Sequence, residues 1–441
     1  MATKNPTRLG KLIMMPQVDD GATPAYSNPK TASQIVAGLA ATPPTAAIIE
    51  AEVFVPNPSR SVFSRESLKS DFYELAPISG DQHGQEFSVR FPVNGWATSV
   101  PGTSPTTTSS PSIGIFQSIL GSAIAMDPLA AGAGGPGAAG TGSDSDTVNY
   151  STGAYKVGSA VGLENGSFYE AAFIESDAAS ALELLIANST EFGNAADSST
   201  IYGSVTCFNS PTALASFSML WQSYTANSRL LITSAIPTSV TVTFDPRSQL
   251  MMEVTFITNT VEQADSGASA LDEFNYSLPI IQPPSGGNNS RLVFQNDSSG
   301  SAFTDLDCEG FQMTLTQELT PVISNGATTG VRDMVVQSRS QEIAFSTLIG
   351  DKNPFDQTPD GKPFVDLSNP SNVGAIQLFV GSQPGKMFGV LIPKPIMTQV
   401  PEMADLNGVF AQSFMLKPGD YQNAAAGTGE AKASNFRVAF V

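Results

Sequence analysis

Residues 239–259 read SVTVTFDPRSQLMMEVTFITN, which is the pattern of two β-strands joined by a turn. The turn is Asp245-Pro246-Arg247-Ser248. Such residues favour turns because Pro presets φ and short polar side chains hydrogen-bond the nearby backbone. Just before this pair, Ser216–Trp221 and Arg229–Ser234 have a similar strand pattern. The sequence therefore predicts two successive antiparallel hairpins here.

A second block of the chain repeats this pattern of strands and turns. Its members are Ala375–Val380, Phe388–Ile392, the Pro395 region, the turn Asp405–Gly408 and the long strand Val409–Leu416. Farther upstream, Gln85–Val89 and Gln341–Phe345 occupy corresponding places, and both begin with Gln-Glu. Strand length, strand order and turn spacing match, which indicates an internal duplication. Convergent hairpin patterning would also produce part of this likeness.

A duplication has a consequence for assembly. Two quasi-equivalent units in one chain mean that a ring of such chains has half as many subunits as structural units. We therefore expect a mainly β protein with two tandem β-sandwich or partly rolled barrel domains, each with a short flanking helix. The expected domains are residues 46–268 and 269–441, after an N-terminal segment 1–45.

The regions around these strands are less regular. Residues 1–45 are rich in Pro, Thr and Ala, which fits an extended arm or a disordered terminus. Residues 130–147 are a Gly/Ala/Asp-rich insertion that we expect to be a flexible surface loop. Residues 259–268 are expected to be a polar linker between the domains.

Two segments have a helical pattern. Ser110-Pro111 is a favourable helix start, and apolar residues at helical spacing continue from Ile113 until Asp127-Pro128 ends the pattern. Residues Ala178–Ala187 have a similar, shorter pattern, and we expect a packing helix there.

The composition argues against several functional classes. The 441 residues are 41% hydrophobic and only 14% charged, with a formal net charge of −19. This balance argues against a protein that binds nucleic acid through phosphate contacts, since those need clustered Lys and Arg. It is compatible with an acidic surface past which DNA moves without binding, and equally with ordinary solubility. We expect no membrane segment and no signal peptide.

The residues that usually carry chemistry are few. The single histidine, His83, lies in a predicted turn, and Cys207 and Cys308 are too far apart in sequence to suggest a metal site. We expect both cysteines to be reduced thiols. Acidic residues gather at Glu50/Glu52, Asp305/Asp307/Glu309 and Glu402/Asp405, which leaves a glycan hydrolase on a β-scaffold as an enzyme alternative. We expect no catalytic, cofactor or metal site.

The strand pattern resembles the tail tube (major tail) proteins of long-tailed bacteriophages over most of the chain. In the first part the likeness lies in the Pro-rich lead, the strand Gln85–Val93, Gly95-Trp96 and the helix from Pro111. The C-terminal part matches better. It contains Gly374–Val380, the strand Gly389–Met397, Gln399–Glu402 and the final strand Asn435–Phe440.

The resemblance implies a structural virion protein of the viral tail, made in the bacterial host cytoplasm. Such subunits form stacked rings around a channel through which viral DNA passes without specific binding. With two tube-like domains per chain, homotrimeric rings with pseudo-sixfold symmetry are expected, and homohexameric rings are the alternative. Other tail proteins, such as the tape measure, terminator and distal tail proteins, would be further partners.

Ring stacking is expected to use long loops. The candidates are the mixed-charge stretch from Arg60 to Gly84 and a matching loop from Thr320 to Arg339, which ordinary solvated loops would also explain. The charged residues expected at ring contacts are Arg60, Arg65, Lys69, Asp71, Arg332 and Arg339. A capsid decoration protein or another virion β-protein is the second reading of the whole sequence.

Overall fold

A computed structural model gives the arrangement of most strands of the chain. It describes residues 10–17, 25–41, 45–49, 51, 53–54, 62–63, 78–79, 85–96, 110–127, 147–149, 156–165, 168–178, 181–185, 200–210, 215–223, 229–245, 248–264, 281, 291–295, 303–306, 308–324, 331–348, 375–381, 383, 385–399, 402–406, 409–420 and 431–441.

These residues form mainly antiparallel β-sheets with two short α-helices, and no sheet among them closes into a barrel. The prediction of a mainly β protein is confirmed. The helices are α1 (Ala32–Ala40) and α2 (Pro111–Leu120), and short 3-10 turns are η1 (Ala25–Ser27) and η3 (Ala431–Ala433). None of the described helices is long and apolar enough to cross a membrane.

The strands fall into two groups along the chain. The strands up to residue 264 are β1 (Gly10–Pro16), β2 (Ala47–Ile49), β3 (Val53–Phe54), β4 (Val62–Phe63), β5 (Ile78–Ser79), β6 (Gln85–Pro92), β7 (Gly121–Met126), β8 (Thr147–Asn149), β9 (Ala160–Asn165), β10 (Phe168–Ala178), β11 (Ala181–Leu185), β12 (Thr200–Tyr202), β13 (Ser204–Asn209), β14 (Phe217–Ser223), β15 (Arg229–Phe244), β16 (Met251–Thr258) and β17 (Thr260–Ala264). The later strands are β18 (Arg291–Gln295), β19 (Phe303–Leu306), β20 (Cys308–Ile323), β21 (Val331–Leu348), β22 (Ile376–Val380), β23 (Phe388–Ile392), β24 (Pro395–Met397), β25 (Glu402–Leu406), β26 (Val409–Pro418) and β27 (Arg437–Phe440).

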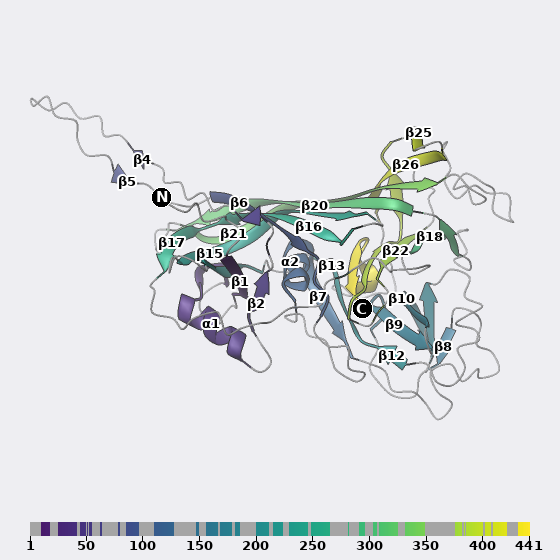
Figure 1. Cartoon of the computed structure of the whole chain (residues 1–441), viewed down its shortest axis with the longest axis horizontal. Helices are drawn as coiled ribbons and strands as arrows, with labels where there is room; N and C mark the ends of the chain where they lie inside the picture. The colour runs from purple at the N-terminus through teal and green to yellow at the C-terminus, as the bar shows by residue number, and fades with distance from the viewer. Residues whose placement is uncertain are drawn as a thin grey trace, which may run out of the picture.

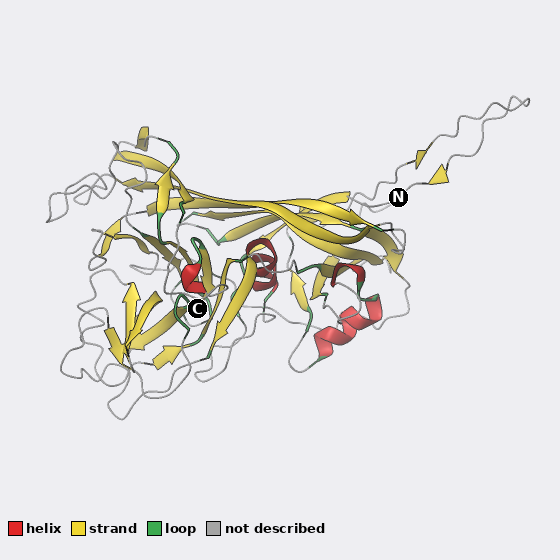
Figure 2. Cartoon of the chain, turned by 180° about the vertical axis from the view of Figure 1, so that it is seen from behind, coloured by secondary structure: helices red, strands yellow, loops and turns green. Residues whose placement is uncertain are grey.

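One long sheet forms one side of the molecule. Its strands lie in the order β3-β6-β16-β15-β20-β21-β26, and β24 and β25 both pair with β26 at the far end. Both α-helices and the other layers of strands lie on the same side of it (Figures 1 and 2). We call these strands the large sheet, and we call its side away from the helices the open face.

The large sheet has an apolar inner face because its strands alternate in polarity. In β6 and β16 every second side chain is buried. A row of buried phenylalanines crosses four neighbouring strands, with ring centroids 5.5 Å apart for Phe244 and Phe311 and 5.2 Å apart for Phe345 and Phe414. Phe311 lies opposite Phe345 between these two pairs. The row links strands from both blocks into one hydrophobic core.

The two blocks have the same strand order and the same pairings. In the first block β1 pairs β2 and β14, β3 pairs β6, β6 pairs β16, and β15 pairs β14, β16 and β17. In the second, β18 pairs β19 and β22, β20 pairs β21, β21 pairs β26, β23 pairs β22 and β27, and β24 and β25 pair β26. Strand β15 thus corresponds to β23, β24 and β25 together.

The blocks are nevertheless joined through shared sheets. Strand β15 of the first block pairs β20 of the second, so the large sheet continues across the boundary expected at residues 268 and 269. Strand β13, between α2 and β14, pairs β27 near the C-terminus. A small sheet, β12-β9-β10-β11-β8, packs on the second block through Phe173 and Phe379, whose ring centroids are 5.3 Å apart.

Both helical predictions need correction. The first helix ends at Leu120, because Gly121 takes a left-handed conformation with φ of 103° that caps it, and Gly121–Met126 continue as β7. The second segment is no helix. Residues 181–185 are β11, which pairs both β10 and β8, so sheet pairing outweighs the helical spacing of a short apolar run.

Three other segments also differ from expectation. Within the expected arm, Gly10–Pro16 form β1, which pairs on both sides in a sheet, and α1 follows with a capping box at Thr31. Within the expected linker, residues 260–264 form β17. The strands predicted at Arg229–Ser234 and Ser239–Phe244 are one strand, β15, with a bulge between Pro237 and Ser239. The Gly/Ala/Asp-rich insertion lies outside the described residues apart from Thr147.

Candidate assembly interface

The open face is polar and rich in hydroxyl groups. Ser88 and Thr255 form a hydrogen bond across β6 and β16 with oxygens 3.0 Å apart, and Ser346 and Ser413 form another of 3.0 Å across β21 and β26. Thr241 of β15 lies opposite Thr314 of β20 at the junction of the blocks. Because its paired side chains are polar, we expect this face to stay in contact with water.

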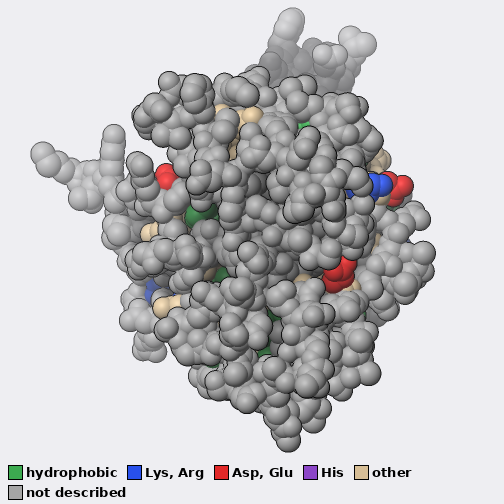
Figure 3. Space-filling model, turned by 90° about the vertical axis from the view of Figure 1, so that its right-hand side faces the viewer, with side chains coloured by type: hydrophobic (Ala, Val, Ile, Leu, Met, Phe, Trp, Pro, Cys, Tyr) green, Lys and Arg blue, Asp and Glu red, His purple; other side chains and the backbone are tan. Residues whose placement is uncertain are grey.

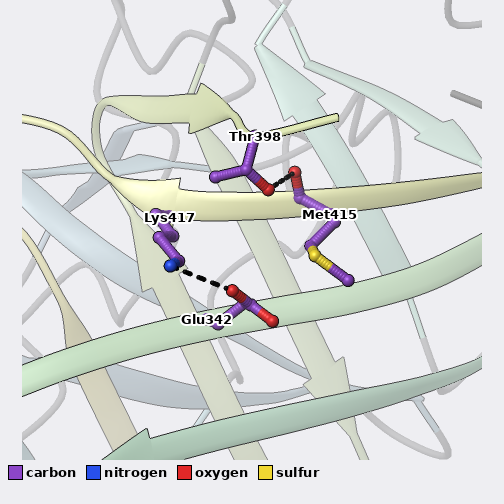
Figure 4. A network of polar contacts seen from close by, with 4 residues as sticks. All are labelled: Glu342, Thr398, Met415 and Lys417. Atoms are coloured by element: carbon purple, nitrogen blue, oxygen red, sulfur yellow. Dashed lines mark hydrogen bonds and ion pairs between the residues drawn. The ribbon is translucent and has the colours of Figure 1, made fainter. Parts of the chain in front are cut away.

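Two pairs of oppositely charged side chains lie on the open face. Lys417 Nζ lies 3.2 Å from Glu342 Oε2, and nearby Thr398 donates a hydrogen bond to the backbone oxygen of Met415 (Figure 4). Arg90 lies opposite Glu253 in the register of β6 and β16. An exposed ion pair of this kind contributes at most about 1 kcal/mol to stability. Its larger effect is to neutralise the cation.

Carboxylates outnumber cations on this face. Away from the tip of the β20–β21 hairpin, its described charged side chains are Glu86, Glu253, Glu318, Glu342, Arg90 and Lys417. These four carboxylates and two cations give this described part of the face a net negative charge. It would repel a phosphate backbone, and each of its two cations faces a carboxylate.

The described charges at one end of the molecule are also scattered. Figure 3 shows that on this side the described charged side chains lie in small separate places, with one basic and one acidic group side by side, and that they form no single basic patch. Hydrophobic side chains of the described part are visible there only in small areas.

The outer part of the β20–β21 hairpin packs on Tyr26 and Ile236 through Val331 and Met334, but no other described strand pairs beside it. The described pairing of β20 with β15 ends at Thr316, and that of β21 with β26 ends at Ile343, so the outer part of the hairpin is paired only within itself. Its tip carries the exposed large hydrophobic residues of the described chain, Val322 at 40%, Ile323 at 77% and Val335 at 51% exposure. The predicted loop Thr320–Arg339 is therefore mostly strand, and these apolar residues were missed by the sequence reasoning.

The predicted ring-contact residues fall into three groups. Arg60, Arg65, Lys69 and Asp71 lie outside the described residues. The segment that holds them connects β3 to β6, as the hairpin tip connects β20 to β21, so the two predicted loops occupy equivalent positions. Arg332 is exposed near the tip, and its backbone oxygen accepts a hydrogen bond from Ser27 Oγ.

Arg339 has a role inside the chain. Its Nη1 donates to the backbone oxygen of Leu120 at 3.0 Å and to that of Ser210. The side chain thus binds the C-terminal end of α2, where the helix dipole favours a cation. Partial burial lowers the pKa of the Arg339 guanidinium. This placement favours a structural tether between the blocks over the exposed ring contact that the sequence suggested.

Removing this tether should affect the folding of the single chain. We expect Arg339→Met to lower the free energy of unfolding by about 1.5–3 kcal/mol, because charge-assisted hydrogen bonds to two buried carbonyl groups are lost. Arg332→Met on the same strand is the control and should change stability by less than about 0.5 kcal/mol. Chemical denaturation of both variants measures this, and equal stability of the two would contradict the tether.

The described residues include few side chains suited to catalysis or metal binding. Cys207 is fully buried, its Sγ lies 3.6 Å from the backbone oxygen of Ile113, and burial raises the pKa of its thiol. No group of three His, Cys, Asp or Glu residues in the described part could hold a metal ion. The side chains of His83, Cys308 and the acidic clusters predicted from sequence lie outside the described set.

A small cavity lies between α2 and the strands beside it. Its volume is about 40 Å³, and its lining includes Met14, Pro111, Gly114 and Phe217. Ligand-binding pockets are usually several hundred Å³ in volume. The cavity therefore has room for little more than water.

Comparison with known proteins gives no relative. No protein-family model matches the chain, and no curated protein sequence matches it.

Proposed function

We propose that the chain is a structural virion protein, the tail tube subunit of a long-tailed bacteriophage, which assembles with copies of itself into stacked rings. The observation that carries this proposal is the side-by-side pairing of two equivalent units in the large sheet. The first unit is β3-β6-β16-β15, and the second is β20-β21-β26 with β24 and β25. One chain thus already contains one contact between neighbouring units of a ring.

The register of the two units supports their equivalence as tube-like domains. Phe87 lies opposite Phe256 and Val89 opposite Val254, while Ile343 lies opposite Leu416 and Phe345 opposite Phe414 at the corresponding positions. One side-chain hydrogen bond matches as well. Thr238 Oγ1 donates to the backbone oxygen of Thr255 at 3.2 Å, and Thr398 Oγ1 donates to that of Met415 at 3.1 Å. The same hydrogen bond at the same register favours a duplication over convergent patterning.

The same contact repeated between chains produces a closed ring. Head-to-tail contacts between identical subunits form rings when the rotation closes. With two units per chain, three chains would give a pseudo-sixfold ring, and six chains are the alternative. The open face would then line a channel, and its net negative charge would let viral DNA pass without binding. The exposed tip with Val322, Ile323 and Val335 would contact the next ring in the stack.

Electron microscopy of the purified, concentrated protein tests this proposal. We expect hollow rings and stacks of rings, with three strong and three weaker lobes in end view. Six identical lobes would favour hexameric rings. Particles that stay monomeric at all concentrations would contradict the proposal and favour a decoration protein of the capsid, which shares the low charge and β-rich pattern.

A further inference from the structure

The large sheet ends in two strands that have a neighbour on one side only among the described residues. At one end β3 pairs β6, and at the other end β25 pairs β26. By the equivalence of the two units, β3 corresponds to β20, and β25 corresponds to the second half of β15. Within the chain these counterparts, β15 and β20, lie side by side.

The pairing of β15 with β20 within the chain gives the register expected for a pairing of β25 with β3. Phe244 of β15 lies opposite Phe311 of β20. Phe311 also lies opposite Phe345, and Phe54 lies opposite Val89, which is the counterpart of Phe345. Phe54 is therefore the counterpart of Phe311.

The same reasoning places the partner residue on β25. Thr241 lies opposite Glu253, and Glu402 lies opposite Ser413, which is the counterpart of Glu253. Three residues farther along each strand, Phe244 corresponds to Asp405.

We infer that β25 of one copy pairs antiparallel with β3 of a second copy, with Asp405 opposite Phe54 and, one residue beyond the last pair of the in-chain junction, Leu406 opposite Val53. This inference rests on the proposed function and adds to it the two strands that meet and their register. The pair of Asp405 with Phe54 repeats Phe244–Phe311, the last of the six consecutive pairs that join the blocks at the β15–β20 junction. We take a second copy as the partner because β20, the counterpart of β3, already pairs within the chain with β15, the counterpart of β25. The same contact between β25 and β3 can then form between two chains.

The pairing also removes two open strand edges at once. Unpaired edges expose backbone hydrogen-bonding groups and invite uncontrolled association. A head-to-tail pairing between β25 and β3 leaves neither edge open once the ring is closed.

An engineered disulfide tests the register. Residues directly opposite each other have Cα atoms about 4.5–5.5 Å apart, within the range that a disulfide spans. We expect Val53→Cys combined with Leu406→Cys to form bonds between chains in the assembled protein under mild oxidation. The main product on a denaturing gel should be a covalent trimer. The control is Val53→Cys with Ala404→Cys, which moves one cysteine by two residues, about 7 Å along the strand.

The outcomes separate this inference from the proposed function. Cross-linking of the Leu406 variant at least fivefold above the Ala404 control supports the register. Rings without cross-linking, or with equal cross-linking of both variants, overturn the register and leave the ring intact. No rings from the unmodified chain overturn both. If the cysteine variants alone fail to assemble, a density map of unmodified rings decides whether β25 or another strand adjoins β3.

Discussion

Replacing Phe311 with alanine is expected to lower the free energy of unfolding by about 3–5 kcal/mol, the range for a large aromatic side chain removed from a core. Phe311 is buried in the phenylalanine row, with Phe244 on one side and Phe345 on the other. The surrounding strands are hydrogen-bonded on both sides and have little freedom to close the cavity. Urea denaturation followed by fluorescence or circular dichroism measures the loss.

The matched control for this variant is Thr314→Ala on the same strand. Thr314 belongs to the open face, so its truncation leaves the core intact and should change stability by less than about 0.5 kcal/mol. Because Phe311 joins the two blocks, we also expect its loss to prevent ring formation at temperatures where the control still assembles. A loss below about 1.5 kcal/mol for Phe311→Ala would show that the row does not hold the blocks together.

The second large effect concerns DNA. If the open face lines the channel, replacing Glu86 and Glu318 with lysine reverses its charge balance. Each ring of three chains would gain six cations. We expect assembled tubes of this variant to retain DNA at least ~10-fold more tightly at 50 mM salt, with an affinity that falls steeply as salt rises. Filter binding across a salt series measures both quantities.

The control carries the same change of charge elsewhere. The control variant combines Asp127→Lys with Glu175→Lys. Both residues are exposed: Asp127 follows β7 and Glu175 lies in β10, in the layers beneath the large sheet (Figure 1). If DNA passes along the open face, the control should not retain it inside tubes. Equal retention by both variants would mean that DNA responds to the total charge, and the assignment of the open face as channel wall would fail.

Local patterns predicted much of the strand content. The strands around Gln85–Val89, Phe388–Ile392 and Val409–Leu416 are where their alternation and turns placed them. The helix from Pro111 begins as predicted, and the glycine that ends it is visible in the sequence. The segment at 181–185 was misjudged because a short apolar run suits both a helix and a strand until its neighbours are known.

The candidate interface was less predictable because it depends on contacts between distant parts of the chain. No local sequence pattern indicates that β15 pairs β20 or that β13 pairs β27. Arg339 was predicted to lie in an exposed loop, but its segment is a strand. The face on which it lies depends on the register, which has an irregularity between Val336 and Ser338.

Strand β15 has a mechanical consequence. Its first residues, 229–233, pair with β14 and β17 in the layer beneath, and residues 239–244 pair with β16 and β20 in the large sheet. A single stiff strand therefore belongs to both layers of the first block, and sliding one layer over the other would break hydrogen bonds in both. A filament made of such subunits would bend at the joints between rings, while each subunit kept its shape.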